Sequence, residues 1–390
     1  MRKRIFFSVG DPSGDTHTAA LIGEIYRQVP EARCRGLGGD QMAHAGCEII
    51  YPLVNHAIVG IFDAVRGVPF FRRLLRQVAE EFDRNRPDMV VLVDYPGFNW
   101  WVAREARKRD ITVYYFLPPQ IWAWATWRVR KMRRLVDCVL CAYPFEVPWY
   151  RARGVPAVFA GHPYWDTLRR LPPAPSTLTR LREGGRVVTL LPGSRDREVE
   201  RNGPVFARVA ALLREQFPDL RFLAACRTER HAAAVARMMR RAGVPTDFVV
   251  GATPHAIEVA DLCLAKSGSV TLELLWHARP AVVYYRVPRT EYGIYRMADA
   301  CGMVQARFIS LPNIAAGREI LPEYVSWTDL APALADRLAV WLRDPDAASQ
   351  TACALAQVRA RFDRVNVLEF TARCILGDAE STRVTLRPAA

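Results

Sequence analysis

The stretch ADLCLAKSGSVTLELLW, residues 260–276, has the pattern of a buried strand, a turn of small residues and a helix. The turn falls at 267–269, and Glu273 lies one turn inside the helix. Such a turn directs several backbone N–H groups and the positive end of a helix dipole at one point, which suits a diphosphate. An ionised Glu just beyond it can accept hydrogen bonds from two sugar hydroxyls. The stretch therefore predicts a nucleotide-diphosphate site, although an ordinary strand–turn–helix would use Gly and Ser here too.

Length, charge and cysteine content narrow the class of protein around this stretch. The chain has 390 residues, too many for one core, so two domains are expected. Its formal net charge of +14 predicts acidic partners, namely nucleic acid, phosphorylated small molecules or an anionic membrane surface. Nine cysteines without a framework spacing are typical of a reducing cytosol. Neither a signal peptide nor a transmembrane helix is expected, because no apolar run is long enough.

The first strand of the chain, residues 4–10, runs into a Gly-rich turn and then a helix expected over about 16–28. A strand, a turn and a helix in this order are typical of the opening of a Rossmann-like domain. Ser13 or Asp15 could equally cap the helix, which is the alternative to a ligand-binding role. The candidate cleft residues in this turn are Asp11, Ser13, Gly14 and Asp15.

A second buried strand, residues 88–94, ends in the carboxylate of Asp94. Ligands gather at the carboxyl ends of the strands in an open parallel sheet. An acid at this position is a candidate for proton chemistry, so Asp94 is the predicted general acid or base of the chain.

Two regions combine apolar or aromatic residues with arginines. Residues 57–71 are nearly all apolar and precede an arginine cluster, a composition typical of an interfacial membrane segment but also of a core helix with a solvated end. Tryptophans at 122–127 precede a basic helix and can contact single-stranded nucleic acid or phosphorylated lipid. The membrane-contact candidates are Ile61, Phe62, Phe70, Phe71, Trp122, Trp124 and Arg128.

A second Rossmann-like domain is predicted to open with the strand at 187–191, followed by Ser194 and Arg195. The helix after it is expected to start near Asn202, with Pro204 in its first turn. A later strand, 281–285, ends at Arg286. The fold class is therefore α/β, with two Rossmann-like domains and a cleft between them.

The predicted boundaries follow from these patterns. They are an N-terminal domain at 1–168, a linker at 169–185, a C-terminal domain at 186–345, helices at 346–376 that pack back on the N-terminal domain, and a flexible tail at 377–390.

Taken together, a collinear series of motifs resembles the lipid-A-disaccharide synthases, which are glycosyltransferases of the GT-B type in glycosyltransferase family 19. The resemblance covers about residues 5–325 and rests on SGD (13–15), GLGGDQMAHAGCEIIYPL (36–53), DYPGFN (94–99), PQIWAW (119–124), PFE (144–146), GHP (161–163), LPGSRDREVE (191–200), SGSVTLE (267–273), YRV (285–287) and SLPNIAAGRE (310–319). No single motif is decisive, but their common order makes the resemblance specific.

The resemblance implies a reaction and its partners. UDP-2,3-diacylglucosamine would transfer its sugar, with inversion, to the 6-hydroxyl of 2,3-diacylglucosamine 1-phosphate, giving a β-1,6-linked tetraacyl disaccharide 1-phosphate and UDP. No metal and no other cofactor is implied. The expected location is peripheral, on the cytoplasmic face of the inner membrane, without a nucleic-acid partner, and the resemblance suggests a homodimer.

Roles for individual residues follow from the resemblance and from the chemistry of the transfer. Asp94 would be the base for the incoming hydroxyl, and Arg195 would stabilise the leaving diphosphate. Trp122, Trp124 and the segment at 58–71 would seat the acceptor and its acyl chains. The donor-site candidates are Ser194, Ser267, Gly268, Ser269, Thr271, Glu273, Arg286, Asn313 and Glu319.

The chain departs from the family pattern at a few positions. Asp11 replaces a Glu, Gly97 replaces a second Asp, Lys266 replaces a small residue and Ser269 replaces a Thr. Other hypotheses therefore stay open: another GT-B enzyme that acts on a UDP-sugar, such as a lipid-linked sugar transferase or a 2-epimerase, a non-catalytic lipid-binding homologue, or an RNA-binding module.

Overall fold

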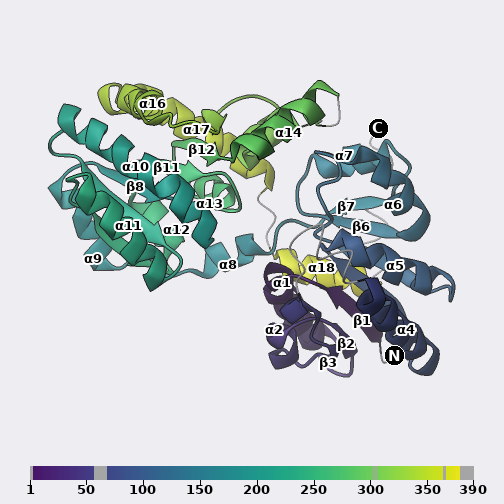
Figure 1. Cartoon of the computed structure of the whole chain (residues 1–390). Coiled ribbons are helices and arrows are strands. Elements are labelled where there is room, and N and C mark those ends of the chain that lie inside the picture. Colours follow the sequence, from purple (N-terminus) through teal and green to yellow (C-terminus); the bar gives the residue numbers. More distant parts are fainter. Residues whose placement is uncertain (1–2, 57–67, 302–303, 305, 363–365, 378–390) are drawn as a thin grey trace. The chain divides into compact units, whose positions relative to one another are not determined.

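The computed structural model describes residues 3–56, 68–301, 304, 306–362 and 366–377. The chain divides into two compact units, Met1–Arg169 with Phe362–Ala390, and Arg170–Arg361. Each unit is built around one parallel sheet covered by helices on both faces (Figure 1). None of the described helices combines the length and the apolar character needed to cross a bilayer.

The first unit contains a seven-stranded sheet in the order β3-β2-β1-β4-β5-β6-β7. The chain builds outward from β1 to one edge and then continues on the other side of β1, so the order reverses between β1 and β4. Ligands bind outside the carboxyl ends of the strands at such a switch point. The strands are β1 (Arg4–Val9), β2 (Arg33–Leu37), β3 (Glu48–Tyr51), β4 (Met89–Val93), β5 (Thr112–Phe116), β6 (Cys138–Cys141) and β7 (Ala157–Phe159).

Helices cover both faces of this sheet, which is why its central strands are continuous apolar runs. Successive side chains of β1 point to opposite faces. Phe6 packs with α4 and α5, whereas Phe7 packs with α1 and α18. The helical segments are α1 (Pro12–Gln28), α2 (Asp40–His44), η1 (Leu53–His56), α4 (Val68–Arg84), α5 (Pro96–Arg107), η2 (Thr126–Arg128), α6 (Val129–Leu135), α7 (Glu146–Arg151), α8 (Tyr164–Arg170) and α18 (Val367–Leu376).

Helix α18 belongs to the first unit although it follows the second unit in the chain. It lies against α1 (Figure 1) and buries Leu368 and Ile375 in the same core cluster as that helix. The buried carboxylate of Asp166 accepts the backbone N–H groups of Val367 and Leu368 at 3.3 and 3.0 Å. A negative charge is favourable at a helix N-terminus, so this contact fixes the start of α18.

The second unit contains a six-stranded sheet in the order β10-β9-β8-β11-β12-β13. Its order reverses between β8 and β11, which places a second switch point at the carboxyl ends of these two strands. The strands are β8 (Val187–Leu191), β9 (Arg221–Cys226), β10 (Asp247–Val250), β11 (Leu262–Lys266), β12 (Ala281–Arg286) and β13 (Glu323–Ser326).

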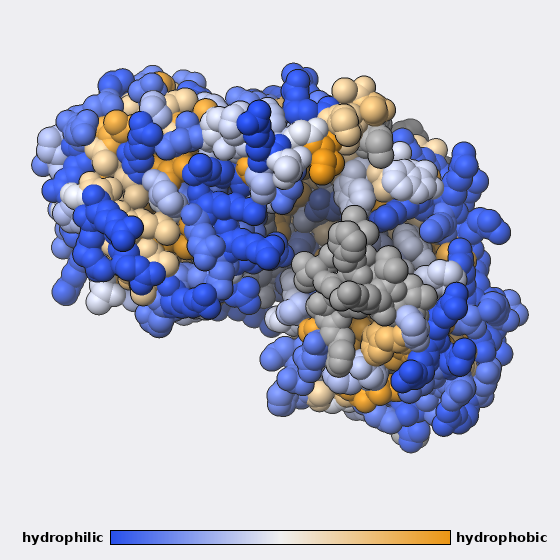
Figure 2. Space-filling view, in the orientation of Figure 1, coloured by the Kyte–Doolittle hydropathy of each residue, from blue (hydrophilic) through white to orange (hydrophobic). Residues whose placement is uncertain are grey.

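The helices of the second unit are unequally buried. Helices α10, α11 and α16 share one core cluster that includes Phe206, Phe222 and Leu338. By contrast, α14 has no buried residue, and Ile294 and Met297 are 65% and 68% exposed, so apolar side chains are visible over this helix in Figure 2. The segments are α9 (Ser176–Thr179), η3 (Arg180–Gly184), α10 (Asp196–Gln216), α11 (Glu229–Arg241), α12 (Thr253–Val259), α13 (Val270–Trp276), α14 (Arg289–Ala300), α15 (Leu311–Ala316), α16 (Ala331–Arg343) and α17 (Pro345–Phe362).

Helix α10 starts at Asp196, so the expected start near Asn202 was wrong. Glu198 accepts the backbone N–H of the N-cap residue Arg195 at 3.3 Å, and this contact stabilises the true start. Pro204 lies inside the helix, on its exposed side. The proline therefore did not mark the first turn, and Asn202 has a different task, described below.

Candidate active site

The carboxyl end of β4 presents Asp94 at the switch point of the first unit. Parallel pairing sets Val9 beside Val93, so the turn after β1 lies next to the turn after β4. The backbone oxygen of Asp94 accepts hydrogen bonds from the Tyr115 hydroxyl at 2.6 Å and the Asn99 side chain at 2.8 Å. Asp94 itself has a φ of 38°, a left-handed conformation that Asp tolerates better than most residues. These bonds fix the backbone, so the carboxylate projects from a rigid position.

Asp94 has an environment that favours its protonated form. Its pKa is raised to about 6, first because the surrounding protein limits hydration of the charge and then because Asp11 carries the same charge nearby. Asp94 is nevertheless exposed to solvent, so its carboxyl is accessible to a substrate. A carboxyl with a pKa close to neutral is suited to accept and release a proton.

Of the four residues proposed in the turn after β1, Asp11 is the one that affects Asp94. It is the N-cap of α1, and one of its carboxylate oxygens accepts the Gly14 N–H at 2.8 Å. The other oxygen is buried and has no hydrogen-bond partner among the described residues. Helix α1 therefore starts at Pro12 rather than near residue 16, because Asp11, not Ser13 or Asp15, caps it.

Asp15 has a structural task. Its buried carboxylate accepts the N–H groups of Gly39, Gln41 and Met42 at 2.8, 3.0 and 3.3 Å, and so caps α2. Ser13 is exposed in the first turn of α1. The sequence therefore placed the whole turn correctly at a strand end, but only tertiary contacts separate the residue that faces Asp94 from the one that holds the fold.

The sequence had suggested that Trp122 contacts the membrane, but the structure does not place it on the surface. It is buried, and its indole N–H donates to Glu146 at 2.9 Å. Glu146 is also buried, accepts the Tyr143 N–H at 3.1 Å, and has its pKa raised to about 7 by desolvation. The indole is thus the hydrogen-bond donor that makes a buried carboxyl tolerable, which is a core function.

Trp124 and its neighbour Trp127 are the exposed members of this aromatic group, at 55% and 58%. The guanidinium carbon of Arg128 lies 5.0 Å from the Trp124 ring centre and 5.8 Å from that of Trp127. Such contacts are cation–π interactions. Two exposed indoles around one arginine therefore form a surface that combines apolar area with positive charge.

The apolar segment near residue 60 is only partly described. Ile61 and Phe62 lie outside the described residues. Phe70 and Phe71 lie in the first turn of α4 and pack against the core of the first unit, with ring centres 5.5 Å from Tyr51 and 5.4 Å from Phe98, respectively. For these two phenylalanines, the core alternative fits better than a membrane seat.

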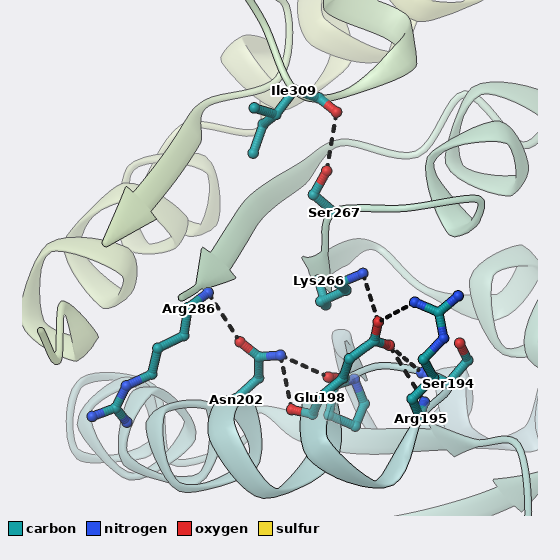
Figure 3. Close-up of polar contacts among 9 residues, drawn as sticks. Ser194, Arg195, Glu198, Asn202, Lys266, Ser267, Arg286 and Ile309 are labelled. Carbon is teal, nitrogen blue, oxygen red and sulfur yellow. Dashed lines mark hydrogen bonds and ion pairs between the residues drawn. The ribbon is translucent and has the colours of Figure 1, made fainter. Parts of the chain in front are cut away.

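The switch point of the second unit holds Ser194 and Arg195 after β8, and Lys266 at the end of β11 (Figure 3). All three contact Glu198 in the first turn of α10. Its carboxylate accepts the backbone N–H groups of Ser194 at 2.9 Å and Arg195 at 3.3 Å. It also pairs with the Lys266 ammonium at 3.0 Å and the Arg195 guanidinium at 3.4 Å. One carboxylate therefore organises the loop after β8 and joins it to the end of β11.

The turn after β11 is the stretch that predicted a diphosphate site. Gly268 and Ser269 are exposed, and the Thr271 hydroxyl donates to the Gly268 backbone oxygen at 2.7 Å. Ser267 is nearly buried, and its hydroxyl donates to the Ile309 backbone oxygen at 3.0 Å. Glu273 is buried in α13, which begins at Val270. Gly268 and Ser269 are thus the exposed residues of the turn.

Asn202 connects this switch point to the end of β12. Its amide nitrogen donates to the backbone oxygens of Pro192 and Glu198 at 3.1 and 2.9 Å, and its oxygen accepts the Arg286 N–H at 3.3 Å. The Arg286 guanidinium donates to the Arg201 backbone oxygen at 3.4 Å. In Figure 3 the Arg286 side chain extends away from Lys266 and Arg195. The structure therefore does not bring its charge to the turn.

Asn313 holds the segment before β13 in place. It is fully buried, donates to the Leu321 backbone oxygen and to Glu323, and accepts the N–H groups of Ile320 and Leu321, with all four contacts at 2.7–2.9 Å. Glu319 is exposed beyond the end of α15. Asn313 therefore shapes the segment from inside rather than facing a ligand.

Sequence patterns missed three residues that organise these sites, namely Glu198, Asn202 and Glu323. Glu323 accepts the N–H groups of Ile309 and Ser310 at 2.7 and 2.8 Å, and so fixes the loop that contacts Ser267. Glu198 lies three positions after Arg195, in the first turn of α10, where a negative charge is favourable, but this position alone does not mark a ligand-binding role. Asn202 and Glu323 act on distant segments and left no local pattern.

The two switch points differ in chemistry. The first holds a carboxyl of raised pKa, which suits proton transfer. The second holds backbone N–H groups, hydroxyls, one guanidinium and one ammonium, which suit an anion such as a phosphate. Each unit by itself therefore offers one kind of chemistry, proton exchange in the first and anion binding in the second.

Comparison with known proteins agrees with this chemistry. A family model described as lipid-A-disaccharide synthetase matches residues 5–364. The lipid-A-disaccharide synthase of Geobacter sulfurreducens is 32% identical over 375 residues, covering 96% of each chain. The enzyme of the same name from Azoarcus sp. is 34% identical over 353 residues, covering 89% of each chain.

Solved structures give the fold. A putative UDP-N-acetylglucosamine 2-epimerase from Listeria monocytogenes superposes with a TM-score of 0.65 at 10% identity, covering 100% of both chains. The structure titled S. aureus MnaA with UDP superposes with a TM-score of 0.63 at 11% identity, covering 100% of this chain and 99% of that one. At such identities the likeness concerns the fold alone, and it confirms the expected GT-B type. With the family match over nearly the whole length, the chain belongs to the lipid-A-disaccharide synthetase family.

Proposed function

We propose that this chain is the inverting glycosyltransferase that joins UDP-2,3-diacylglucosamine to 2,3-diacylglucosamine 1-phosphate. The products are the β-1,6-linked tetraacyl disaccharide 1-phosphate and UDP. The observation that carries the proposal is the family match over residues 5–364 in a chain that keeps Asp94 at the end of β4 and Arg195 after β8.

Asp94 is the base in this proposal. It removes the proton from the acceptor 6-hydroxyl as the oxygen attacks the anomeric carbon and the bond to the UDP oxygen breaks. Attack on the face opposite the leaving group inverts the configuration. The bonds to the Asp94 backbone oxygen support this role, because they fix the main chain from which the carboxylate projects.

The second unit binds the donor. Arg195 and the turn at Ser267–Ser269 bind the diphosphate, whose negative charge increases as the bond to the sugar breaks. Glu273 accepts hydrogen bonds from the ribose hydroxyls. Asn313 and Glu323 act indirectly, because they hold the loop that contacts Ser267.

Product analysis tests the proposal directly. The purified chain is mixed with UDP-diacylglucosamine and diacylglucosamine 1-phosphate, and the products are analysed by mass spectrometry. The expected products are UDP and one tetraacyl disaccharide 1-phosphate in equal amounts. UDP release without a disaccharide, or conversion of the donor to an isomer, would contradict the proposal and favour an epimerase or a hydrolase.

The pH dependence of the reaction should reflect Asp94. Because the base must be ionised, kcat/KM should fall about tenfold per pH unit below the pKa of about 6. Asp11→Asn removes the neighbouring negative charge, so the pKa of Asp94 should fall and the acid limb should move to lower pH. Asn remains a good N-cap, so α1 should be retained.

The matched control for this measurement is Asp110→Asn. Asp110 is exposed and precedes β5, so it lies at the amino ends of the strands, whereas Asp94 lies at their carboxyl ends. The control should leave the acid limb of the pH profile in place. An unchanged acid limb in Asp11→Asn, or an equal shift in both variants, would show that Asp11 does not raise the pKa of Asp94.

The acceptor and the donor both carry acyl chains, so we propose a peripheral membrane location in which Trp124, Trp127 and Arg128 contact anionic lipid. Exposed indoles and a guanidinium suit the interface of a membrane. The suggested homodimer stays a prediction.

The Trp124→Ala/Trp127→Ala double variant should sediment severalfold less with vesicles of phosphatidylglycerol and phosphatidylethanolamine. Trp327→Ala is the control, because Trp327 is also exposed and also carries a stacked arginine, but belongs to the second unit. Equal sedimentation of the double variant and the control would contradict the assignment of this surface.

A further inference from the structure

Lys266 occupies a defined position beside the turn that was predicted to bind the diphosphate. Its side chain is 13% exposed, and its ammonium lies 3.0 Å from a carboxylate oxygen of Glu198. The ammonium also lies 4.8 Å from the centre of the Tyr285 ring. A methyl group added at Gly268 would lie 3.4 Å from it. The ammonium is therefore held against the turn, not free in solvent.

Glu198 is the reason that two cations can lie together here. The guanidinium of Arg195 and the ammonium of Lys266 both contact the same carboxylate oxygen, at 3.4 and 3.0 Å. Burial alone would raise the pKa of Glu198, but the Ser194 N–H and Lys266 lower it, so the carboxyl stays ionised. One carboxylate contacts two cations (Figure 3), so these three side chains together carry one net positive charge.

Arg286 had been expected to contribute a positive charge. Its guanidinium instead donates to the Arg201 backbone oxygen, and its side chain points away from the turn (Figure 3). Among the drawn residues, Lys266 is the cation that accompanies Arg195. Where the family pattern has a small residue, this chain thus has the charged side chain of Lys266.

We propose that Lys266 is a donor-binding residue whose ammonium contacts the diphosphate together with Arg195, and that Glu198 is the positioning residue that holds both cations. This inference rests on the proposed function. It follows from the geometry, because a diphosphate at the Ser267–Ser269 turn lies within reach of an ammonium that already faces Gly268. Without the ammonium, Glu198 and Arg195 would cancel and the site would lose its net positive charge.

Calorimetric titration with UDP and with uridine tests the role of Lys266. Lys266→Met should bind UDP at least about tenfold more weakly than the unaltered chain, as expected for a lost charge-assisted contact. Its affinity for uridine, which has no phosphate, should equal that of the unaltered chain. Lys266→Arg should restore most of the UDP affinity, and Arg286→Met should weaken UDP binding less than Lys266→Met. Lys108→Met, an exposed lysine of the first unit, should change neither affinity.

The outcomes separate this inference from the proposed function. If the unaltered chain binds no UDP, the proposed function is wrong. If the unaltered chain binds UDP and Lys266→Met binds it equally well, only the role of Lys266 is wrong. A parallel loss of uridine binding would assign Lys266 to the fold, and this result would also overturn the inference.

A double-mutant cycle tests Glu198 as a positioning residue. Glu198→Gln keeps an acceptor for the Ser194 N–H but loses the charge that holds the two cations. As a single variant, Glu198→Gln should weaken UDP binding. In combination with Lys266→Met its additional effect should be clearly smaller, because the ammonium that Glu198 positions is then already absent. Equal losses in both backgrounds would show that Glu198 does not act through Lys266.

Discussion

The Asp94→Asn variant should form the disaccharide about 10²–10⁴-fold more slowly than the unaltered chain, the range expected when a general base is lost. It should bind UDP normally, since the donor residues belong to the other unit. The amide has the shape of the carboxylate but cannot accept a proton from the 6-hydroxyl. Asn also tolerates the left-handed φ of 38° at this position, so the turn after β4 should keep its conformation.

Turnover and UDP affinity measured side by side check this expectation. Asp110→Asn serves again as the control for loss of one carboxylate. Asp94→Glu is informative as well, because it keeps the proton acceptor but moves it by one methylene, and partial activity is expected. Full turnover in Asp94→Asn would end the assignment of Asp94 as the base, whereas loss of UDP binding would indicate that the variant is misfolded.

The Glu273→Gln variant should bind UDP about ten- to a hundredfold more weakly, corresponding to the loss of charge-assisted hydrogen bonds of about 1.5–3 kcal/mol. Glu273 is buried in the first turn of α13, directly after the turn at Ser267–Ser269. An ionised carboxylate there can accept bonds from both ribose hydroxyls, but an amide has one acceptor oxygen only. The effect should therefore depend on the sugar and not on the phosphates.

Comparison of UDP with 2′-deoxy-UDP isolates this contact. The unaltered chain should prefer UDP, and Glu273→Gln should lose most of that preference. Glu258→Gln, on α12 of the same unit, is the matched control and should keep it. If Glu273→Gln weakens both nucleotides equally and retains the preference, Glu273 supports the fold of α13 and does not hold the ribose.

The strands that carry both sites could be predicted from the sequence with good accuracy. The predicted strands at 4–10, 88–94 and 187–191 correspond to Arg4–Val9, Met89–Val93 and Val187–Leu191. Strands of a parallel sheet covered on both faces are continuous apolar runs, so their signal is local. The residues after such a run lie at the carboxyl ends of the strands, which is why Asp94 could be placed there without a structure, whereas its role as a base stays a prediction.

Helix starts and side-chain burial were less predictable. Pro204 suggested a first turn, but α10 starts at Asp196, six residues before Asn202. Trp122 and Trp124 stand two positions apart in one motif, yet one is buried against Glu146 and the other is exposed. The sequence shows that tryptophans and arginines are close together in the chain, but their burial depends on which other segments pack against them.

The sequence by itself determined the strand ends and the parallel α/β fold, because these rest on apolar runs of residues close together in the chain. It also determined the family, which rests on motifs in a common order along the chain. The tertiary structure decided which charges meet. Asp11 raises the pKa of Asp94 across the β1–β4 switch point. Glu198 holds Lys266 across the β8–β11 switch point, where Arg286 had been expected. Electrostatic interactions depend on distance in space, so only the folded chain could show that Glu198 holds the Lys266 ammonium against the turn at Ser267–Ser269.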